Sequence, residues 1–398
     1  MKKILKERKI NIVEKNKKIK GIVISDIHIG AISAKKLRKE LVNIFIKKVK
    51  EIEDLDLLII NGDFFDHKLS LNSEDSKLGI EILNSLSNLA SKNDFYIRII
   101  KGTKNHDNDQ LNNFIYLEKK YKGKIRFINL VTDEFLSIKD NNLHLLYLPE
   151  EYVEDMSYYD EYLNESKSYD LVFGHGTFSH VGFTNSNQES ERPYKNAVTF
   201  NYTQFKDIVK GFVMFGHIHE KNEYHNIYYT GSFSRWAFNE EKDKGFYLFD
   251  YDCENSNYNL KFIKNDLCDE YKTINIDNII SDENLSSKEK LDIIKKISKS
   301  ISPNTKLRIV FDNNLLSKYS DSNILKDYFA KEKNFKIKID NKEKVKEQDE
   351  ENKILKEYSF LFDENLPIED IISTYLQKHN NITLSKDVIK ELLYEDND

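Results

Sequence analysis

The chain has 398 residues, of which 39% are hydrophobic and 32% are charged, and it carries a formal net charge of −6. At roughly 150 residues per domain, this length corresponds to two or three domains. Four prolines and thirteen glycines are too few for long disordered linkers, so the composition indicates a folded globular protein. The small negative net charge excludes a general attraction to nucleic acid, and any contact with DNA would need a local basic patch or bound metal ions.

The number of cysteines and the length of the apolar runs indicate the cellular compartment in which the protein works. Cys253 and Cys268 are too few for a disulfide framework and lie outside any CxxC pattern, which indicates a reducing environment. The first twenty residues are basic and lack the apolar core of a signal peptide, and no later run approaches the about 20 apolar residues of a membrane span. We therefore expect a cytoplasmic protein, in a bacterial cell or a phage-infected host, without a membrane partner.

Residues 1–252 alternate short apolar runs with helical periodicity, which predicts βαβ units. Helices are expected over residues 34–53 and around Leu78 to Leu89, where apolar residues recur on one face. The predicted strands are, in chain order, GIVIS, LDLLII, FYIRII, DLVF, GFVMF and two segments near residues 227–230 and 246–250. These elements form the first predicted domain.

Residues 253–340 predict a small α+β domain, with strands at YNLKFI, KLRIVF and FKIKI and a helix from Ser287 to Ser300. Residues 341–356 are almost wholly charged, which predicts a solvated linker, with an exposed helix as the alternative.

Residues 357–398 predict a helical tail. Pro367 stands at a helix start and Ser385 at the N-cap of a second helix. The apolar face of the first helix carries Ile368, Ile371, Ile372, Tyr375 and Leu376. Such a face could bind a partner or pack on the chain's own core, and the sequence leaves both open.

Polar side chains follow five of the predicted strands, directly or after a short glycine-containing loop. In open α/β sheets, ligands bind beyond the carboxyl ends of the strands, where several loops converge. A single histidine in such a place is more often structural than functional, but five clusters in order indicate one site. The clusters are Asp26 with His28, Asp63, Asn105 with His106, His175, and His217 with His219.

The chemistry of this donor set indicates two transition-metal ions. Carboxylate, imidazole and amide groups together bind Mn²⁺, Fe²⁺ or Zn²⁺, whereas Mg²⁺ and Ca²⁺ prefer oxygen ligands alone. Two ions about 3.5 to 4 Å apart can share one carboxylate, activate water and hold a phosphate between them. A nearby imidazole can then protonate the leaving oxygen, so we expect hydrolysis of phosphoesters.

Five segments, SDIHIG, NGDFFD, GTKNHD, FGHG and FGHIH, resemble in this order the signature motifs of the calcineurin-like metallophosphoesterases. The stretch YYTGSFSRWAFNEEKDKGFYLFD resembles the segment after the last motif in SbcD and the related Mre-type recombination nucleases. The motif-level resemblance covers roughly residues 20–252. It implies an α/β fold, a β-sandwich of mixed sheets flanked by helices, with a small α+β capping domain and a helical C-terminal tail.

The resemblance also implies roles for the clustered residues, with Mn²⁺ as the expected ion. The implied ligands are Asp26, His28 and His219 for the first ion, Asp63 as the bridge, and Asn105, His175 and His217 for the second ion. His106 becomes the catalytic histidine, which agrees with its place beside a ligand.

Two departures from the family pattern stand out. Thr103 and Lys104 are inserted into the usual GNHD motif, which puts the conformation of that loop in doubt. Asp66 occupies a position where some relatives carry a functional histidine, and His67 follows it; we interpret His67 as a surface residue and assign it no role.

Three hypotheses follow. The first is a DNA nuclease of the SbcD type, acting in recombination, repair or replication, for which the family implies a homodimer. In that family the small domain caps the site and helps to hold DNA, and the tail binds a separate SbcC-like coiled-coil ATPase. The second is an enzyme acting on small phosphodiesters or phosphomonoesters, which would need neither cap nor tail. The third is a non-catalytic scaffold, which would be expected to lose ligands, whereas here every ligand position is filled.

Overall fold

The fold is described from a computed structural model. The structure describes residues 18–275 except 108, 154, 180–197 and 239, and after them residues 289, 292–293, 296, 305–312, 335–340, 367–380 and 384–394. The chain divides into two compact units, Met1–Thr273 with Lys296–Arg308, and Ile274–Lys295 with Ile309–Asp398. Each unit is described by itself.

The first unit contains a six-stranded mixed sheet with the order β14-β13-β1-β2-β3-β4. Its parallel strands are β1 (Lys18–Ile24), β2 (Leu57–Asn61), β3 (Tyr96–Ile100) and β4 (Ile125–Ile128). β13 (Gly245–Asp252) pairs antiparallel with β1, and β14 (Tyr258–Lys264) pairs antiparallel with β13. β2 is buried at every position, as expected for a parallel strand covered on both faces.

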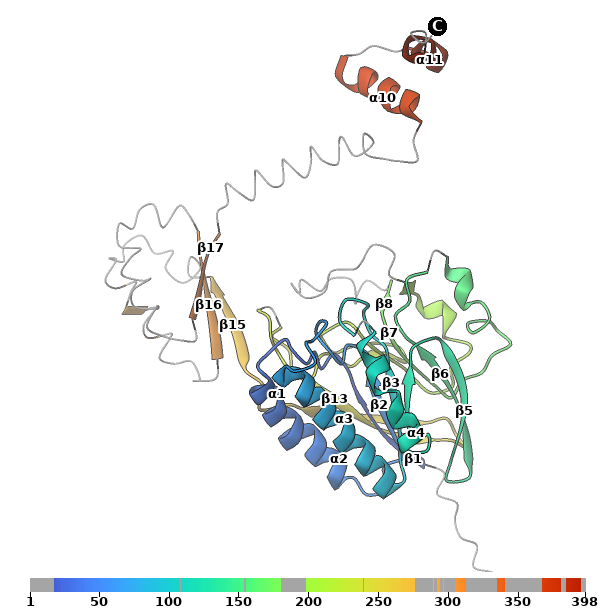
Figure 1. Cartoon of the computed structure of the whole chain (residues 1–398), viewed down its shortest axis with the longest axis vertical. Helices are drawn as coiled ribbons and strands as arrows, with labels where there is room; N and C mark the ends of the chain where they lie inside the picture. The colour runs from blue at the N-terminus through green and yellow to red at the C-terminus, as the bar shows by residue number, and fades with distance from the viewer. Residues whose placement is uncertain are drawn as a thin grey trace, which may run out of the picture. The chain divides into compact units, whose positions relative to one another are not determined.

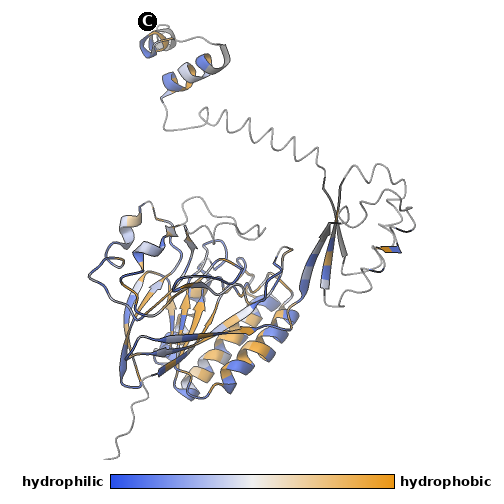
Figure 2. Cartoon of the chain, turned by 180° about the vertical axis from the view of Figure 1, so that it is seen from behind, coloured by the Kyte–Doolittle hydropathy of each residue, from blue (hydrophilic) through white to orange (hydrophobic). Residues whose placement is uncertain are grey.

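Helices cover one face of this sheet (Figure 1). They are α1 (Ala34–Glu40), the π-helical stretch η1 (Leu41–Ile46), α2 (Lys47–Glu51), α3 (Glu74–Asn93) and α4 (Tyr116–Lys120). The helices carry hydrophobic and hydrophilic residues side by side (Figure 2), and their apolar residues pack with Ile22, Ile24 and Leu58 of the sheet. Ser73 caps α3, since its Oγ accepts a hydrogen bond from the Ser76 amide at 3.0 Å.

A second six-stranded sheet has the order β11-β12-β10-β7-β6-β5. Its strands are β5 (Thr132–Ile138), β6 (Asn141–Leu148), β7 (Leu171–His175), β10 (Val213–Gly216), β11 (Asn222–Tyr224) and β12 (Ile227–Tyr229). β6, β7, β10 and β12 are parallel. The core between the sheets contains Val23 and Ile59 from the first and Tyr147, Phe173 and Met214 from the second. The predicted fold, a sandwich of mixed sheets flanked by helices, is confirmed.

Shorter elements connect these strands. β8 (Thr177–Phe178) and β9 (Thr199–Phe200) form a two-stranded ribbon, and single 3₁₀ turns lie at η2 (Gln110–Phe114), η3 (Met156–Tyr159) and η4 (Tyr202–Gln204).

The strand predicted at YNLKFI lies in the first sheet as β14, so this sheet continues to Lys264, past residue 252, where the sequence placed the domain end. The other two strands predicted there are found, and β15 (Glu270–Asn275), β16 (Thr305–Asp312) and β17 (Phe335–Asp340) form a three-stranded sheet in that order. Most of the helix predicted from Ser287 to Ser300, and the whole linker at 341–356, lie outside the described residues. The domain boundaries there stay predictions.

The two tail helices are found where the sequence predicted them, as α10 (Ile368–Asn380) and α11 (Lys386–Tyr394). An ion pair joins Lys386 to Asp370, and the Ser385 hydroxyl oxygen accepts a hydrogen bond from the Val388 amide at 3.4 Å. None of the helices in the described chain has the length and apolar composition that crossing a bilayer requires.

Candidate metal centre

The predicted ligands lie where strands of both sheets end. Asp26 comes two residues after β1, Asp63 two residues after β2, and His175 is the last residue of β7. His217 and His219 follow β10 directly. All five side chains are buried. The two sheets therefore bring their strand ends together at one buried polar site, as the sequence predicted.

Several ligand loops adopt a left-handed backbone conformation. Asp26, His28, Asp63 and His217 have φ angles of 49°, 46°, 47° and 94°. Such positions cost on the order of 1 to 3 kcal/mol each and persist only where the surroundings fix them. Here the Asp26 amide donates to the carbonyl of Gly62 at 3.1 Å, and the His28 amide donates to the carbonyl of Asp63 at 3.0 Å. The loops after β1 and β2 thus hold each other in place.

Two glycines allow the close approach of these loops. A Cβ at Gly62, whose φ is +85°, would lie 2.2 Å from Nδ1 of His175. A Cβ at Gly102 would lie 2.2 Å from Oδ1 of Asp63. The glycines in the NGD and GTKNHD segments are therefore required by the packing of the ligands themselves.

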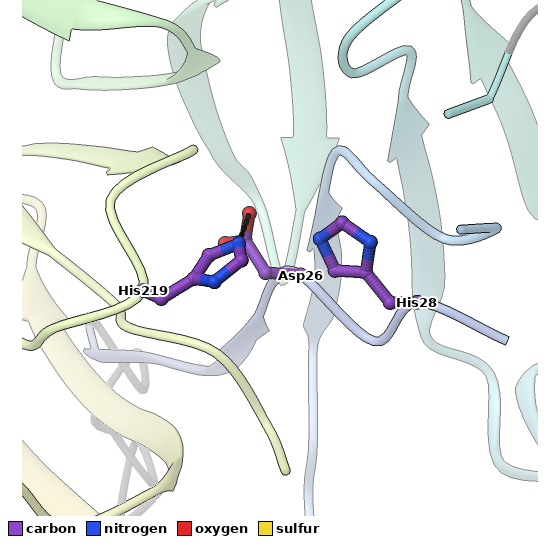
Figure 3. Close-up of side chains that lie close together, drawn as sticks. All are labelled: Asp26, His28 and His219. Atoms are coloured by element: carbon purple, nitrogen blue, oxygen red, sulfur yellow. Dashed lines mark ion pairs between the residues drawn. The ribbon is translucent and has the colours of Figure 1, made fainter. Parts of the chain in front are cut away.

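The first ligand group consists of Asp26, His28 and His219. One donor atom of each lies within 4.8 Å of the others. Figure 3 shows the Asp26 carboxylate next to the ring of His219, with the ring of His28 farther to the right, and Nε2 of His219 is 3.8 Å from Oδ1 of Asp26. This is the group that the resemblance implied for the first ion.

A second group of the same compactness contains Asp63, His175 and His217, and a third contains His28, Asp63 and His106. Oδ2 of Asp63 lies 3.2 Å from Nε2 of His175 and 3.6 Å from Nε2 of His28. Asp63 therefore stands between the two ligand groups, which is the position that a bridging carboxylate requires.

Three of the imidazoles are oriented in the same way. Each uses Nδ1 for a hydrogen bond to an oxygen outside the ligand groups and directs Nε2 into them. The partners are Oδ1 of Asp66 for His28 at 3.1 Å, the Asn61 carbonyl for His175 at 2.8 Å, and Oε1 of Glu240 for His219 at 3.0 Å. A carbonyl or an ionised carboxylate can only accept, so Nδ1 carries the hydrogen and Nε2 is left as a metal donor.

The residues fit a pair of divalent metal ions. Nε2 of His28 is buried and has no hydrogen-bond partner, although it faces Asp63. A buried polar atom without a partner costs free energy, and a cation at that point would supply the partner. Imidazole and carboxylate donors together suit Mn²⁺, Fe²⁺ or Zn²⁺.

The charges in the cluster compensate one another. Burial lowers the pKa of His175, but the charges of Asp63, Asp26 and Glu150 and a hydrogen bond to Asp63 outweigh burial and hold that pKa well above its usual value. Burial raises the pKa of Asp63, but His175 and His28 hold it well below its usual range. Protonated imidazoles here take the place of the positive charge that metal ions would bring.

Glu240 and Trp236 are site residues that sequence reasoning missed. Burial raises the pKa of Glu240, but Lys244 and His219 outweigh burial and bring it to about 2, so the carboxylate that orients His219 is ionised. The Trp236 ring lies 4.4 Å from that of His28 and 4.7 Å from that of His219, between centroids, and covers the first group. Both residues lie in the stretch that resembled the Mre-type segment. Their positions in the sequence did not show that they would contact His28 or His219.

Glu150 was also missed. It follows β6 by two residues and is 3% exposed. Its Oε2 lies 3.7 Å from Nε2 of His175 and 3.7 Å from Nδ1 of His217. The signal was an acidic residue after the apolar run HLLYLP, the same pattern that identified the other strand ends.

Of the two inserted residues, Thr103 and Lys104, Thr103 contacts the proposed bridging carboxylate of Asp63, which the sequence did not predict. Thr103 donates its amide hydrogen to Oδ1 of Asp63 at 2.6 Å. Its hydroxyl lies 2.9 Å from Oε2 of Glu150 and 3.2 Å from Oδ2 of Asp63 and can donate to one of them at a time. Lys104 and Asn105 are exposed. All seven predicted ligands are described; six are buried, and Asn105 is not. His67 is exposed as well, with Nδ1 at 2.9 Å from Oδ2 of Asp66.

His106 lies beside the ligand groups, half-buried, with its ring centroid 4.6 Å from that of His28. Its Nδ1 is hydrogen-bonded to the backbone carbonyl of Asp66. Because a carbonyl only accepts, Nδ1 carries the hydrogen, and Nε2 is the atom that can exchange a proton with a substrate.

Residues 19–221 match the family model described as calcineurin-like phosphoesterase. The chain belongs to this family. A comparison with the curated proteins finds no match. One similar solved structure is 13% identical, with a TM-score of 0.35, over 62% of this chain and 99% of that one. Family membership and the buried clusters make the protein a metal-dependent phosphoesterase with a site suited to two ions.

We predict that His106→Ala keeps both metal ions and reduces turnover by roughly 10²- to 10⁴-fold, the range for a lost general acid. Metal content by plasma mass spectrometry and steady-state rates on a chromogenic diester would measure the two effects. His67→Ala is the matched control and should retain turnover, because His67 is exposed. A parallel loss of metal and activity in His106→Ala would instead make His106 a ligand.

Proposed function

We propose that this protein is a two-metal DNA nuclease of the SbcD and Mre type, acting in recombination, repair or replication. The observation that carries the phosphodiesterase chemistry is that two ligand groups share Asp63, with His106 beside them. We assign Asp26, His28 and His219 to the first ion, and His175 and His217 to the second.

Hydrolysis adds one water across a phosphodiester bond. Two divalent ions held by these residues would lower the pKa of a water and neutralise charge on the phosphate oxygens. A bond forms from the water oxygen to phosphorus, and the bond from phosphorus to the leaving ester oxygen breaks. The imidazolium form of His106 would donate its Nε2 proton to that leaving oxygen, while the Asp66 carbonyl fixes the ring through Nδ1. The proton that the attacking water loses would go to solvent, and the imidazole would take up a proton from solvent before the next turnover. The Trp236 ring packs against the rings of His28 and His219 in the first group.

A macromolecular substrate is favoured by what lies outside the matched family region. The sheet of β15, β16 and β17 and the helices α10 and α11 all follow residue 221. An enzyme for small phosphoesters needs neither. We therefore propose that the small domain caps the site and helps to hold DNA, as the resemblance to SbcD implies, and that Mn²⁺ is the working ion, in keeping with the mixed oxygen and nitrogen donors.

The tail supports a protein partner. On α10, Ile368 is 53% and Tyr375 is 42% exposed, and Ile371, Ile372 and Leu376 are half-buried. An amphipathic helix with exposed apolar residues fits a groove on another protein. We propose an SbcC-like coiled-coil ATPase as that partner, with the nuclease as a homodimer. The proposed compartment is the cytoplasm, in keeping with two free cysteines.

The substrate class can be tested directly. Purified protein with Mn²⁺ should cleave linear duplex, hairpin or single-stranded DNA, and it should lose this activity when the metal is removed with EDTA. A small chromogenic diester serves as the comparison substrate. Hydrolysis of the small diester without cleavage of any DNA form would favour the small-phosphoester alternative and contradict the nuclease proposal.

Deletion of residues 357–398 should leave metal-dependent cleavage of single-stranded DNA largely intact and abolish co-purification with the ATPase, because a cut at a charged segment exposes little buried core. Tyr375→Asp within the full chain should weaken the same association without changing basal cleavage. If the truncated protein unfolds or loses basal hydrolysis, the tail belongs to the enzyme's own core and the partner proposal fails.

A further inference from the structure

We infer that Glu150, and not Asn105, completes the ligand set of the second metal ion. This inference deepens the proposed function and rests on its two-metal site. It departs from the family pattern, in which the asparagine of the GNHD motif takes that position.

The carboxylate of Glu150 lies beside the second ligand group of Asp63, His175 and His217. Its Oε2 lies 3.7 Å from both His175 Nε2 and His217 Nδ1. The Thr103 hydroxyl lies 2.9 Å from this oxygen and 3.2 Å from Oδ2 of Asp63. The two carboxylate oxygens therefore lie on the same hydroxyl, and each is within 3.7 Å of Nε2 of His175.

The Glu150 carboxylate is buried, whereas most carboxylates in proteins are exposed. The Glu150 side chain is 1% exposed, and in the described part of the chain the basic groups within 4 Å of it are His175 and His217. A buried carboxylate is costly unless it is paired with a cation or coordinates a metal. Among the described residues the groups that face this carboxylate are those imidazoles and not a lysine or arginine, and a metal ion beside Asp63 would supply the cation that a carboxylate at this depth requires.

The insertion explains why an asparagine is not needed. Thr103 follows Gly102 directly, where the family motif has its asparagine, and Thr103 is 1% exposed and bound to Asp63. Asn105 stands two residues later and is exposed. Glu150, which follows β6 of the second sheet by two residues, is buried and places its Oε2 3.7 Å from the nitrogens of His175 and His217.

A carboxylate in place of an amide changes the chemistry of the second position. It adds a third negative charge to those of Asp26 and Asp63, and it supplies a harder donor than a neutral amide. Both changes strengthen the hold on an oxygen-preferring dication such as Mn²⁺. The second ion should therefore depend on Glu150 and be insensitive to Asn105.

Calorimetric titration of Mn²⁺ into EDTA-treated full-length protein tests the inference without reference to catalysis. Wild type should bind two ions. Glu150→Gln, which keeps the shape and removes the charge, should retain the first ion and weaken the second at least about tenfold, the smaller end of the loss seen even for outer partners of metal ligands. Asn105→Ala should titrate as wild type does.

Glu151→Gln is the matched control, because it removes the same charge one residue later, from a side chain that pairs with Lys101 at 3.6 Å. Thermal melting without metal checks the fold of each variant. If Glu150→Gln does not fold, Glu150→Asp, which keeps the charge but is one methylene shorter, should still weaken the second ion.

Two results would overturn the inference: unchanged binding of two ions by the Glu150 variants, or loss of the second ion in Asn105→Ala. A failure of the nuclease proposal looks different. In that case the titrations would still separate Glu150 from Asn105, while the wild-type protein loaded with Mn²⁺ would leave DNA uncut.

Discussion

The buried carboxylate of Asp63 is the constraint on which the rest of the site depends. Its Oδ2 faces Nε2 of His28 on one side and Nε2 of His175 on the other, and Thr103 contacts both of its oxygens. A charge at this depth must be balanced, and protonated imidazoles balance it in the absence of metal. Metal ions would displace those protons, so uptake of ions and release of protons are linked at this residue.

The two-sheet sandwich holds the Asp63 carboxylate and the imidazoles that balance its charge in a fixed geometry. Parallel strands of both sheets end at the same site, and their loops accept left-handed backbone angles at Asp26, His28, Asp63 and His217. Outside the ligand groups, Asp66, Asn61 and Glu240 each fix one imidazole through Nδ1. Donor nitrogens are thereby aimed before any ion arrives, which lowers the cost of binding the ions and of positioning a phosphate.

The strands and the clustered ligands could be predicted from the sequence, because a buried apolar run followed at once by polar residues is a local pattern. What could not be predicted depends on contacts through space. In the sequence, Glu150 and Glu240 resemble many other acidic residues. Their roles follow from the fold, which brings Glu150 beside His175 and Glu240 beside His219. Spacing also does not determine that the inserted Thr103 is the residue bound to Asp63 or that Asn105 is exposed. The strand at Tyr258–Lys264 was assigned to the next domain because the sequence pattern of a strand does not show with which other strand it pairs.

Metal analysis of Asp63→Asn tests most directly whether one carboxylate joins the two metal positions. The wild-type chain should retain two Mn²⁺ ions after dialysis. Asp63→Asn removes the shared negative charge, so both positions should empty together and hydrolysis should cease. Asp54→Asn, an exposed carboxylate before β2, should behave as wild type. Retention of two ions by the folded Asp63→Asn protein would contradict the account.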